Sequence, residues 1–389
     1  MVGTPLRLPR ADGSFAPYVP SGAPRHAAVA TGPPRTRVAY AAAHVVADPL
    51  AATDPVLGGA IDWDATIAYR RHLWSLGFSV AEAMDTSQRG MGLSAGHARE
   101  LIRRSVAAAA AAGGGIACGI ATDDLATGAE ATLDQIERAY LDQAAFVEQC
   151  GGRIIMMASR HLARAARCAD DYARIYATVL GQAREPVVLH WLGDMFDPQL
   201  AGYWGADDLD AATEHVLAIV REHAAKIDGI KISLLDAGRE IALRRRLPAG
   251  VRMYTGDDFH YSELIAGDEH GYSDALLGIF DAIAPAARAA LAALDDGDRA
   301  RYAAILAPTV ELSRHIFAAP TYAYKTGVVF LAYLNGYQRH FRMIAGAESA
   351  RSIVHLARIL ELADAAGLIV DQERAAERMA LVLAVAGID

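Results

Sequence analysis

The stretch Ile227-Asp228-Gly229-Ile230-Lys231-Ile232-Ser233-Leu234-Leu235 decides the fold and directs attention to one side chain. Its apolar run predicts a buried β-strand with a single lysine inside it. The chain has only three lysines, Lys226, Lys231 and Lys325, and all its other basic residues are arginine. A lysine desolvated in an apolar strand loses basicity, and its neutral amine can attack a carbonyl. The stretch alone also allows a structural lysine that reaches solvent or a carboxylate at the end of the strand.

The composition predicts a soluble cytoplasmic protein with a large core. Of 389 residues, 53% are hydrophobic and 21% are charged, and the net charge is −9 with a pI near 5.8. This acidic balance argues against nucleic acid or an anionic membrane as partner, because both require a basic surface. Three cysteines without CxxC spacing fit a reducing compartment and give no zinc framework. We find neither an apolar signal-peptide segment near the first residue nor a run of about 18 apolar residues.

Strand-like segments alternate with helical ones on both sides of the lysine stretch. This alternation predicts right-handed βαβ units and a parallel sheet. Eight such units over residues 36–283 favour a closed (β/α)8 TIM barrel over an open sheet. No glycine-rich nucleotide-binding motif follows the first strand. The expected strands are residues 37–46, 78–84, 116–121, 154–158, 186–191, 227–235, 251–254 and 271–274.

Two further regions flank the barrel. Residues 1–35 are rich in proline and glycine and show no sustained period, so we expect a loosely structured arm or a subunit contact. Residues 284–389 show only helical periodicity, with charged outer faces. They predict a C-terminal helical extension that packs on the barrel or on a neighbouring subunit.

In a TIM barrel, function lies at the carboxyl ends of the strands. The polar side chains expected there form a candidate ring around Lys231. Adjacent hydroxyls on one loop can bind a substrate carboxylate together with backbone N–H groups, and the lysine can form an imine with the neighbouring keto carbon. The ring consists of His44, Asp85 with Thr86 and Ser87, Thr122 with Asp123, Ser159 with Arg160, His190, Lys231 with Ser233, Gly256 with Asp257, and His270 with Ser273.

Several of these residues stand in motifs of a known family. The order and spacing of the motifs resemble the dihydrodipicolinate synthase / N-acetylneuraminate lyase family of class I aldolases over about residues 37–340. Asp85 to Ser94 lies without gaps on the family's G-T-T-G-E-S-A-T-L-T loop, and Asp228-Gly229-Ile230-Lys231 resembles its G-I-K strand. The other matching stretches are Ile61-Asp62-Trp63-Asp64 with the helix and Leu76-Gly77 after it, Thr255-Gly256-Asp257-Asp258, and Pro320-Thr321-Tyr322-Ala323-Tyr324-Lys325.

The resemblance implies a Schiff-base lyase without a cofactor. Lys231 would form the imine, Lys325 stands at a second family lysine position, and the protein would be a homodimer or homotetramer. The substrate-binding residues would be Thr86, Ser87, Asp85, Arg89, Ser233, Gly256 and Asp257. Asp257 also fits a simple turn-and-cap role.

The chain departs from the family pattern at four positions. Asp85 replaces a glycine, Ser87 the second threonine and Arg89 a glutamate, and His190 stands where the family has its catalytic tyrosine. With an unperturbed pKa of about 6.5, His190 could take over proton transfer. An inward Asp85 would repel a carboxylate, whereas Arg89 would attract one. The substrate could therefore be a 2-oxo acid or a derivative of a keto sugar, and the reaction could be an aldol cleavage, a condensation or a dehydration.

Two other classes of function fit the same barrel. One is a metal-dependent lyase or isomerase of sugar derivatives, which would need a divalent metal. The other is a non-catalytic barrel that binds a sugar acid. The available metal ligands are His44, His190, Asp194, Asp257, His260, Glu263 and His270, with no HxH or HExxH spacing among them.

Overall fold

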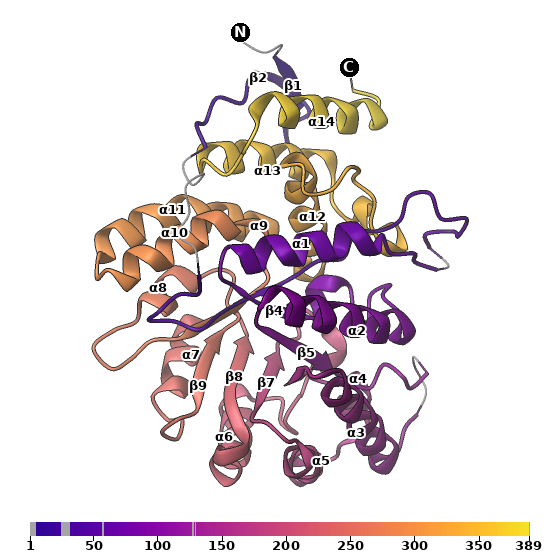
Figure 1. The fold of residues 1–389 in the computed structure, drawn as a ribbon, viewed down its shortest axis with the longest axis vertical. Helices are drawn as coiled ribbons and strands as arrows, with labels where there is room; N and C mark the ends of the chain where they lie inside the picture. The colour runs from indigo at the N-terminus through magenta and orange to yellow at the C-terminus, as the bar shows by residue number, and fades with distance from the viewer. Residues whose placement is uncertain (1–4, 25–31, 57, 127, 129, 389) are drawn as a thin grey trace.

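The computed structural model describes residues 5–24, 32–56, 58–126, 128 and 130–388. Eight parallel strands close into a barrel in the order β10-β3-β4-β5-β6-β7-β8-β9 (Figure 1). The predicted (β/α)8 barrel with a helical C-terminal region is thereby confirmed. The strands are β3 (Ala39–Ala42), β4 (Ser79–Glu82), β5 (Ile116–Ile120), β6 (Arg153–Met156), β7 (Val187–Leu192), β8 (Ile227–Ser233), β9 (Arg252–Thr255) and β10 (Asp274–Leu277).

Helices connect successive strands and cover the outside of the barrel. Their starts follow local signals: the side chains of Asp62, Ser94 and Thr132 accept hydrogen bonds from backbone N–H groups in the first turns of α1, α2 and α3. The helices are α1 (Trp63–Ser75), α2 (Ala95–Ala112), α3 (Leu133–Cys150), α4 (Arg160–Ala165), α5 (Ala169–Gln182), α6 (Leu209–Glu222), α7 (Ala237–Arg244) and α8 (Tyr261–Ala266). Short 3₁₀ turns are η1 (Asp85–Ser87), η2 (Pro198–Leu200), η3 (Ala224–Lys226), η4 (Thr321–Ala323) and η5 (Ile344–Ala350).

The barrel interior combines large side chains such as Tyr40 and Tyr254 with small ones, and they alternate along the strands with outward-facing residues. Ala42, Ala81 and Ala117 lie in this interior cluster with Ile155 and Val188. Alanine on three neighbouring strands leaves more room on that side of the barrel than leucine or isoleucine would.

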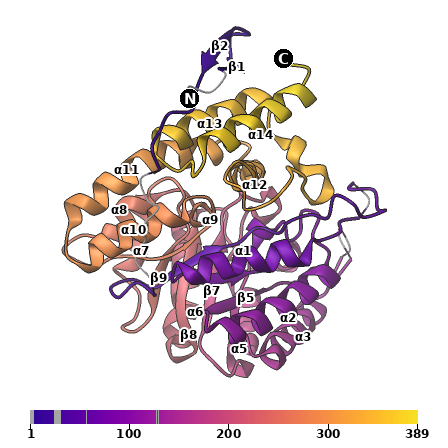
Figure 2. The same ribbon diagram turned by 45° about the horizontal axis from the view of Figure 1, so that its top comes forward.

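After the barrel, the chain is helical, with α9 (Ile279–Ala282), α10 (Ala284–Asp295), α11 (Arg299–Ile316), α12 (Tyr324–Leu334), α13 (Ile353–Ala365) and α14 (Gln372–Val385). Figures 1 and 2 both show α12, α13 and α14 above one end of the barrel. Every residue of α12 is buried. This helix is therefore the central element of the C-terminal region, and its first residues reach the carboxyl ends of the barrel strands.

Part of the N-terminal arm is more regular than expected. Over residues 6–18, where we expected a loose arm, β1 (Leu6–Pro9) and β2 (Phe15–Tyr18) form an antiparallel hairpin. The hairpin packs beside α13 and α14. The carboxylate of Asp364 on α13 accepts hydrogen bonds from the Tyr18 hydroxyl at 2.7 Å and from the backbone N–H of Ser21 and Gly22. These long-range contacts fix the hairpin, and the local sequence carries no sign of them.

The eighth strand was placed too early. We expected it at residues 271–274, but β10 begins at Asp274. Residues before it form a turn in which the Asp268 N–H bonds the carbonyl of Gly271. The apolar run Ala275 to Leu277 is the strand signal in this region. It is hard to recognise because the apolar residues continue into α9.

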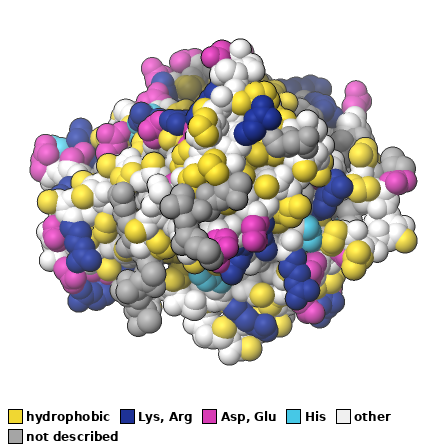
Figure 3. Space-filling view, turned by 90° about the horizontal axis from the view of Figure 1, so that it is seen from above, with side chains coloured by type: hydrophobic (Ala, Val, Ile, Leu, Met, Phe, Trp, Pro, Cys, Tyr) yellow, Lys and Arg dark blue, Asp and Glu magenta, His cyan; other side chains and the backbone are white. Residues whose placement is uncertain are grey.

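The described part of the surface above the barrel has no single dominant charge or hydrophobic patch in the view of Figure 3. Figure 3 shows that basic, acidic and hydrophobic side chains are interspersed on the face at the top of Figure 1. Among the described residues, no helix combines the length and the apolar character needed to cross a membrane.

Candidate active site

Lys231 points into the barrel together with His190. The two residues are register partners on the parallel strands β8 and β7, and Leu192 pairs with Ser233 two residues further on. Neighbours at the same register of a parallel sheet point to the same face. Lys231 is 4% exposed and His190 is fully buried. Both side chains therefore lie in the interior near the carboxyl ends of their strands.

The amine of Lys231 is held in a state that favours deprotonation. Its Nζ makes no hydrogen bond to any described residue. Burial lowers the pKa of Lys231, although the carboxyl groups of Asp85 and Asp258 favour the charged form. A buried amine without a hydrogen-bond partner is closer to the neutral nucleophile that imine formation requires.

Gly256 makes room for this lysine. A Cβ at Gly256 would lie 2.6 Å from Cε of Lys231 and 2.3 Å from Oγ of Ser233. Any side chain there would displace the lysine stem or the serine. Gly256 therefore acts by leaving space, and Ser233 Oγ lies 3.4 Å from Nε2 of His190.

His190 is a neutral imidazole in this site. Burial lowers the pKa of His190 well below its usual value, and the positive charge of Lys231 adds to the effect. Its Nδ1 is buried and has no hydrogen-bond partner among the described residues. A neutral ring with one free nitrogen can accept a proton from a substrate.

The loop after β4 brings a carboxylate beside the lysine. Oδ2 of Asp85 accepts a hydrogen bond from the Tyr324 hydroxyl at 2.7 Å, and Oδ1 has no partner among the described residues. Burial would raise the pKa of Asp85, but the charges of Lys231 and Lys325 outweigh it and lower the pKa to about 2. Asp85 is therefore ionised and partly exposed to the cavity described below.

The two hydroxyls of this loop do not act as a pair. Thr86 Oγ1 lies 2.8 Å from the Tyr324 hydroxyl and thus faces the same side as Asp85. Ser87 is fully buried, and its Oγ donates to the carbonyl of Met84 at 2.7 Å. Thr86 is thus placed near the lysine environment, whereas the Ser87 hydroxyl stabilises the turn.

Tyr324 belongs to this site, although it was not among the candidate residues. Tyr324 begins α12, its ring stacks on Phe317 with centroids 4.3 Å apart, and its hydroxyl reaches Asp85 and Thr86. The partners lie almost 240 residues apart in sequence, and only the packing of α12 on the barrel brings them together. The weak local signal was its position directly before Lys325 in a motif already noted.

Lys325 follows on the same helix and is 4% exposed. The nearest hydrogen-bond partner of its Nζ is the sulfur of Met91 at 3.4 Å, and the ring of Tyr324 lies 4.6 Å away. Burial lowers the pKa of Lys325 to about 8, although Asp85 and Asp197 favour its charged form. The second buried lysine is therefore a weakly partnered cation at neutral pH.

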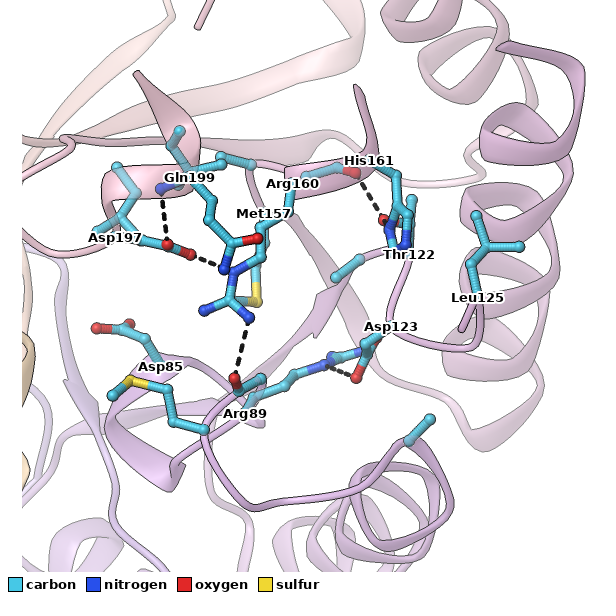
Figure 4. Close-up of a pocket in the computed structure, with 18 of the residues that line it drawn as sticks. Asp85, Arg89, Thr122, Asp123, Leu125, Met157, Arg160, His161, Asp197 and Gln199 are labelled. Carbon is cyan, nitrogen blue, oxygen red and sulfur yellow. Dashed lines mark hydrogen bonds and ion pairs between the residues drawn. The ribbon is translucent and has the colours of Figure 1, made fainter. Parts of the chain in front are cut away.

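A cavity of about 490 Å³ opens beside these groups (Figure 4). Asp85 and Lys325 belong to its wall, whereas Lys231 and His190 are not lining residues and are linked to it through Asp85, whose charge acts on both. Arg89 also reaches the wall, but its guanidinium is bound to Asp123 at 2.7 Å and to Gln143. Arg160 bonds Asp197 and the carbonyl of Gly90. Asp85 connects the cavity to Lys231, because its charge acts on both lysines.

The other candidate residues lie outside this arrangement. Asp257 accepts hydrogen bonds from the N–H groups of Phe259 and His260 and from His260 Nδ1, which is a turn-and-cap role. His44 is paired with Asp281 at 2.8 Å, and Ser273 donates to Glu240. Of the remaining ring residues, Thr122 and Ser159 bond each other in the cavity wall, and His270 lies on the surface. Within the described ranges, no three His, Cys, Asp or Glu side chains could hold a metal ion together.

Known structures share this architecture. Dihydrodipicolinate synthase from Aquifex aeolicus is 13% identical, covers 86% of this chain and 99% of its own, and gives a TM-score of 0.64. YagE from E. coli K12, a prophage protein of the dihydrodipicolinic acid synthase family in complex with pyruvate, is 13% identical, with 90% and 99% covered and a TM-score of 0.64. The dihydrodipicolinate synthase from Bacteroides thetaiotaomicron is 13% identical, with 84% and 98% covered and a TM-score of 0.63.

These likenesses establish that the chain has the fold of the dihydrodipicolinate synthase family. No curated protein matches the chain in sequence. One family model matches residues 6–388, and its description reads "Protein of unknown function (DUF993)". The match spans nearly the whole chain, hairpin and C-terminal helices included. The chain therefore belongs to the DUF993 family, on a barrel of the dihydrodipicolinate synthase type.

Proposed function

We propose that the protein is a Schiff-base-forming lyase that acts through Lys231 on a 2-oxo acid or a keto-sugar derivative. The observation that carries the proposal is the buried amine of Lys231, which has a lowered pKa and no hydrogen-bond partner among the described residues. It lies beside a neutral His190 and an ionised Asp85. The shared fold with dihydrodipicolinate synthases supports the same chemistry.

The chemical steps follow from these groups. The neutral amine adds to the carbonyl carbon, water leaves, and a protonated imine remains as an electron sink. Loss of the proton from a hydroxyl on the β carbon then breaks the bond between the α and β carbons, which releases an aldehyde or ketone and leaves an enamine on the lysine. Alternatively, loss of a proton next to the imine expels a hydroxyl group as water. His190 is the group that would accept the proton, since its ring is neutral and Nδ1 is free.

Trapping the imine tests the proposal. The protein is incubated with pyruvate and a panel of keto sugars and sugar acids, reduced with borohydride, and digested for mass spectrometry. We expect one adduct, on the peptide that holds Lys231, and none on Lys226 or Lys325, the other two lysines. Lys231→Arg should abolish the adduct and turnover. Absence of any adduct, or unchanged turnover in Lys231→Arg, would refute the Schiff-base mechanism.

The metal-dependent alternative receives less support. Its candidate ligands are dispersed: His44 bonds Asp281, and His260 bonds Asp257. Loss of activity in EDTA together with no borohydride adduct would favour it over the imine. A homodimer or homotetramer, as the family resemblance implies, remains a prediction that sedimentation can test.

A further inference from the structure

The cavity is balanced in charge. Its wall contains four acidic and four basic side chains, namely Asp85, Asp123, Asp124, Asp197, Arg89, Arg160, Arg164 and Lys325. Asp123 and Asp197 are paired with Arg89 and Arg160 in the wall, and Asp124 bonds Arg99 behind it. Arg164 has no carboxylate partner among the described residues and bonds the amide of Gln199 at 3.4 Å, but its charge is not among the main ones that act on Lys231 or Lys325. The wall groups without an ion-pair partner that interact with Lys231 are one carboxylate, Asp85, and one ammonium, Lys325.

These two groups are incompletely bonded. Lys325 carries three N–H donors, but among the described residues its Nζ interacts with only a thioether sulfur and an aromatic face. Asp85 uses one oxygen for Tyr324 and leaves the other without a partner among the described residues. A buried donor and a buried acceptor that both border a cavity are costly unless a ligand or water satisfies them.

A hydroxyl group satisfies both, because it donates one hydrogen bond and accepts others. A carboxylate satisfies only the donor. When Lys231 is neutral, as imine formation requires, the charges of Lys325 and Asp85 cancel, and a substrate carboxylate would place an uncompensated negative charge next to Asp85. The neutral His190 adds no compensating charge.

Building on the Schiff-base function, we propose that the substrate is an uncharged, polyhydroxylated ketone of sugar size. Asp85 and Lys325 bind its hydroxyl groups as acceptor and donor. The cavity of about 490 Å³ exceeds the needs of a three-carbon keto acid. Its size is within the range of roughly 300–1,000 Å³ that is common for pockets with much larger ligands.

Matched pairs of ligands test the charge preference. D-Fructose and 2-keto-D-gluconate differ only in a CH₂OH group against a carboxylate, as do L-sorbose and 2-keto-L-gulonate, and other hexulose–hexulosonate pairs widen the panel. Affinities are measured by calorimetry, which does not require an imine. We expect the wild type to bind the preferred ketose at least about tenfold more tightly than its acid.

Variants assign the preference to the two residues. Asp85→Asn should shift the ketose-to-acid ratio toward the acid by about tenfold or more, because Lys325 is then unbalanced. Asp134→Asn is the control, since it removes the same charge from an exposed position on α3. Lys325→Met should weaken ketose binding at least about tenfold while the circular dichroism spectrum stays unchanged.

The inference is overturned if the acids bind as tightly as the ketoses across the panel, if neither kind binds, or if Asp85→Asn leaves the ratio unchanged. Failure of the Schiff-base function gives a different result. In that case the ketose preference and its loss in Asp85→Asn persist, but borohydride traps nothing on Lys231.

Discussion

The charged groups at the two ends of the barrel differ in how completely they are paired. At the amino ends of the strands, Asp228 accepts hydrogen bonds from Arg252 at 2.7 Å, from Tyr254 at 2.6 Å and from Arg153 at 3.4 Å. Arg252 also reaches Asp274. At the carboxyl ends, the Lys231 amine has no hydrogen-bond partner, and Lys325 contacts only a sulfur and a ring among the described residues.

This difference in pairing distinguishes charged groups that stabilise the fold from charged groups that are available to bind a ligand. Buried ions that only stabilise a fold are paired and hydrogen-bonded, because an unpaired buried charge costs free energy. A site that binds and transforms a ligand has to keep some of its groups free until the ligand arrives. We therefore expect substitutions at the amino ends to reduce stability, and substitutions of the free cation at the carboxyl ends to increase it.

The largest effect on stability is expected from Asp228→Asn. The amide keeps the shape but removes the charge that three neighbours share, and it leaves Arg153 and Arg252 partly uncompensated. Both arginines are 44% exposed, so their ion pairs contribute little, but the bond from Tyr254 to the charged acceptor is partly buried. Together we expect a loss of about 2.5 kcal/mol. Urea denaturation should show this loss in the free energy of unfolding. The exposed Asp134→Asn should change it by less than about 0.5 kcal/mol, and a similarly small loss in Asp228→Asn would contradict the structural role.

Lys325→Met should have the opposite sign. The pKa of Lys325 falls from 10.5 to about 8 on folding, so the buried ammonium destabilises the native state. We expect a gain of about 2 kcal/mol at pH 7, less than the shift alone implies, since Asp85 then loses a compensating charge. The unfolded chain binds the proton more tightly. The gain in the free energy of unfolding should therefore have its full value below about pH 8 and disappear as the pH rises to about 10.5.

Lys226→Met provides the matched control for that gain. Lys226 precedes β8 at the other end of the barrel, and its Nζ donates to the carbonyl of Ala183 at 2.8 Å. The same chemical change there removes a satisfied donor and should cost up to about 1 kcal/mol. If Lys226→Met and Lys325→Met changed the free energy of unfolding equally in urea denaturation, the proposed difference between the two ends of the barrel would be wrong.

Most of the barrel strands, and Lys231 at the centre of the site, could be predicted from local sequence patterns. Alternating helical and strand patterns predicted eight strands, because the spacing of apolar residues within a short segment indicates which type of element it forms. Lys231 stood out for the same reason, as one amine within an apolar strand. Asp85 was visible as a departure from a family glycine, and its negative charge made a keto-sugar derivative as plausible a substrate as a 2-oxo acid.

The features that could not be predicted from the sequence depend on contacts between distant segments of the chain. The Tyr324 hydroxyl reaches Asp85 only because α12 packs across the barrel mouth. Arg89 looked free to bind a carboxylate, but Asp123 on the next strand's loop occupies its guanidinium. The N-terminal hairpin likewise depends on Asp364, far along the chain. Such pairings are set by tertiary packing, for which local propensity has no signal.

Two tyrosines allow a direct comparison of the two ends, because each donates a hydrogen bond to a partly buried aspartate. Tyr254→Phe removes the 2.6 Å bond to Asp228, and Tyr324→Phe removes the 2.7 Å bond to Asp85. We expect Tyr254→Phe to cost about 1.5 kcal/mol, in the range for hydrogen bonds to charged groups. Tyr324→Phe should cost about half as much, because Asp85 borders the cavity and water can replace the phenol. Urea denaturation of both variants measures the difference, and a larger loss at Tyr324 would mean that the mouth, too, depends on its internal hydrogen bonds for stability.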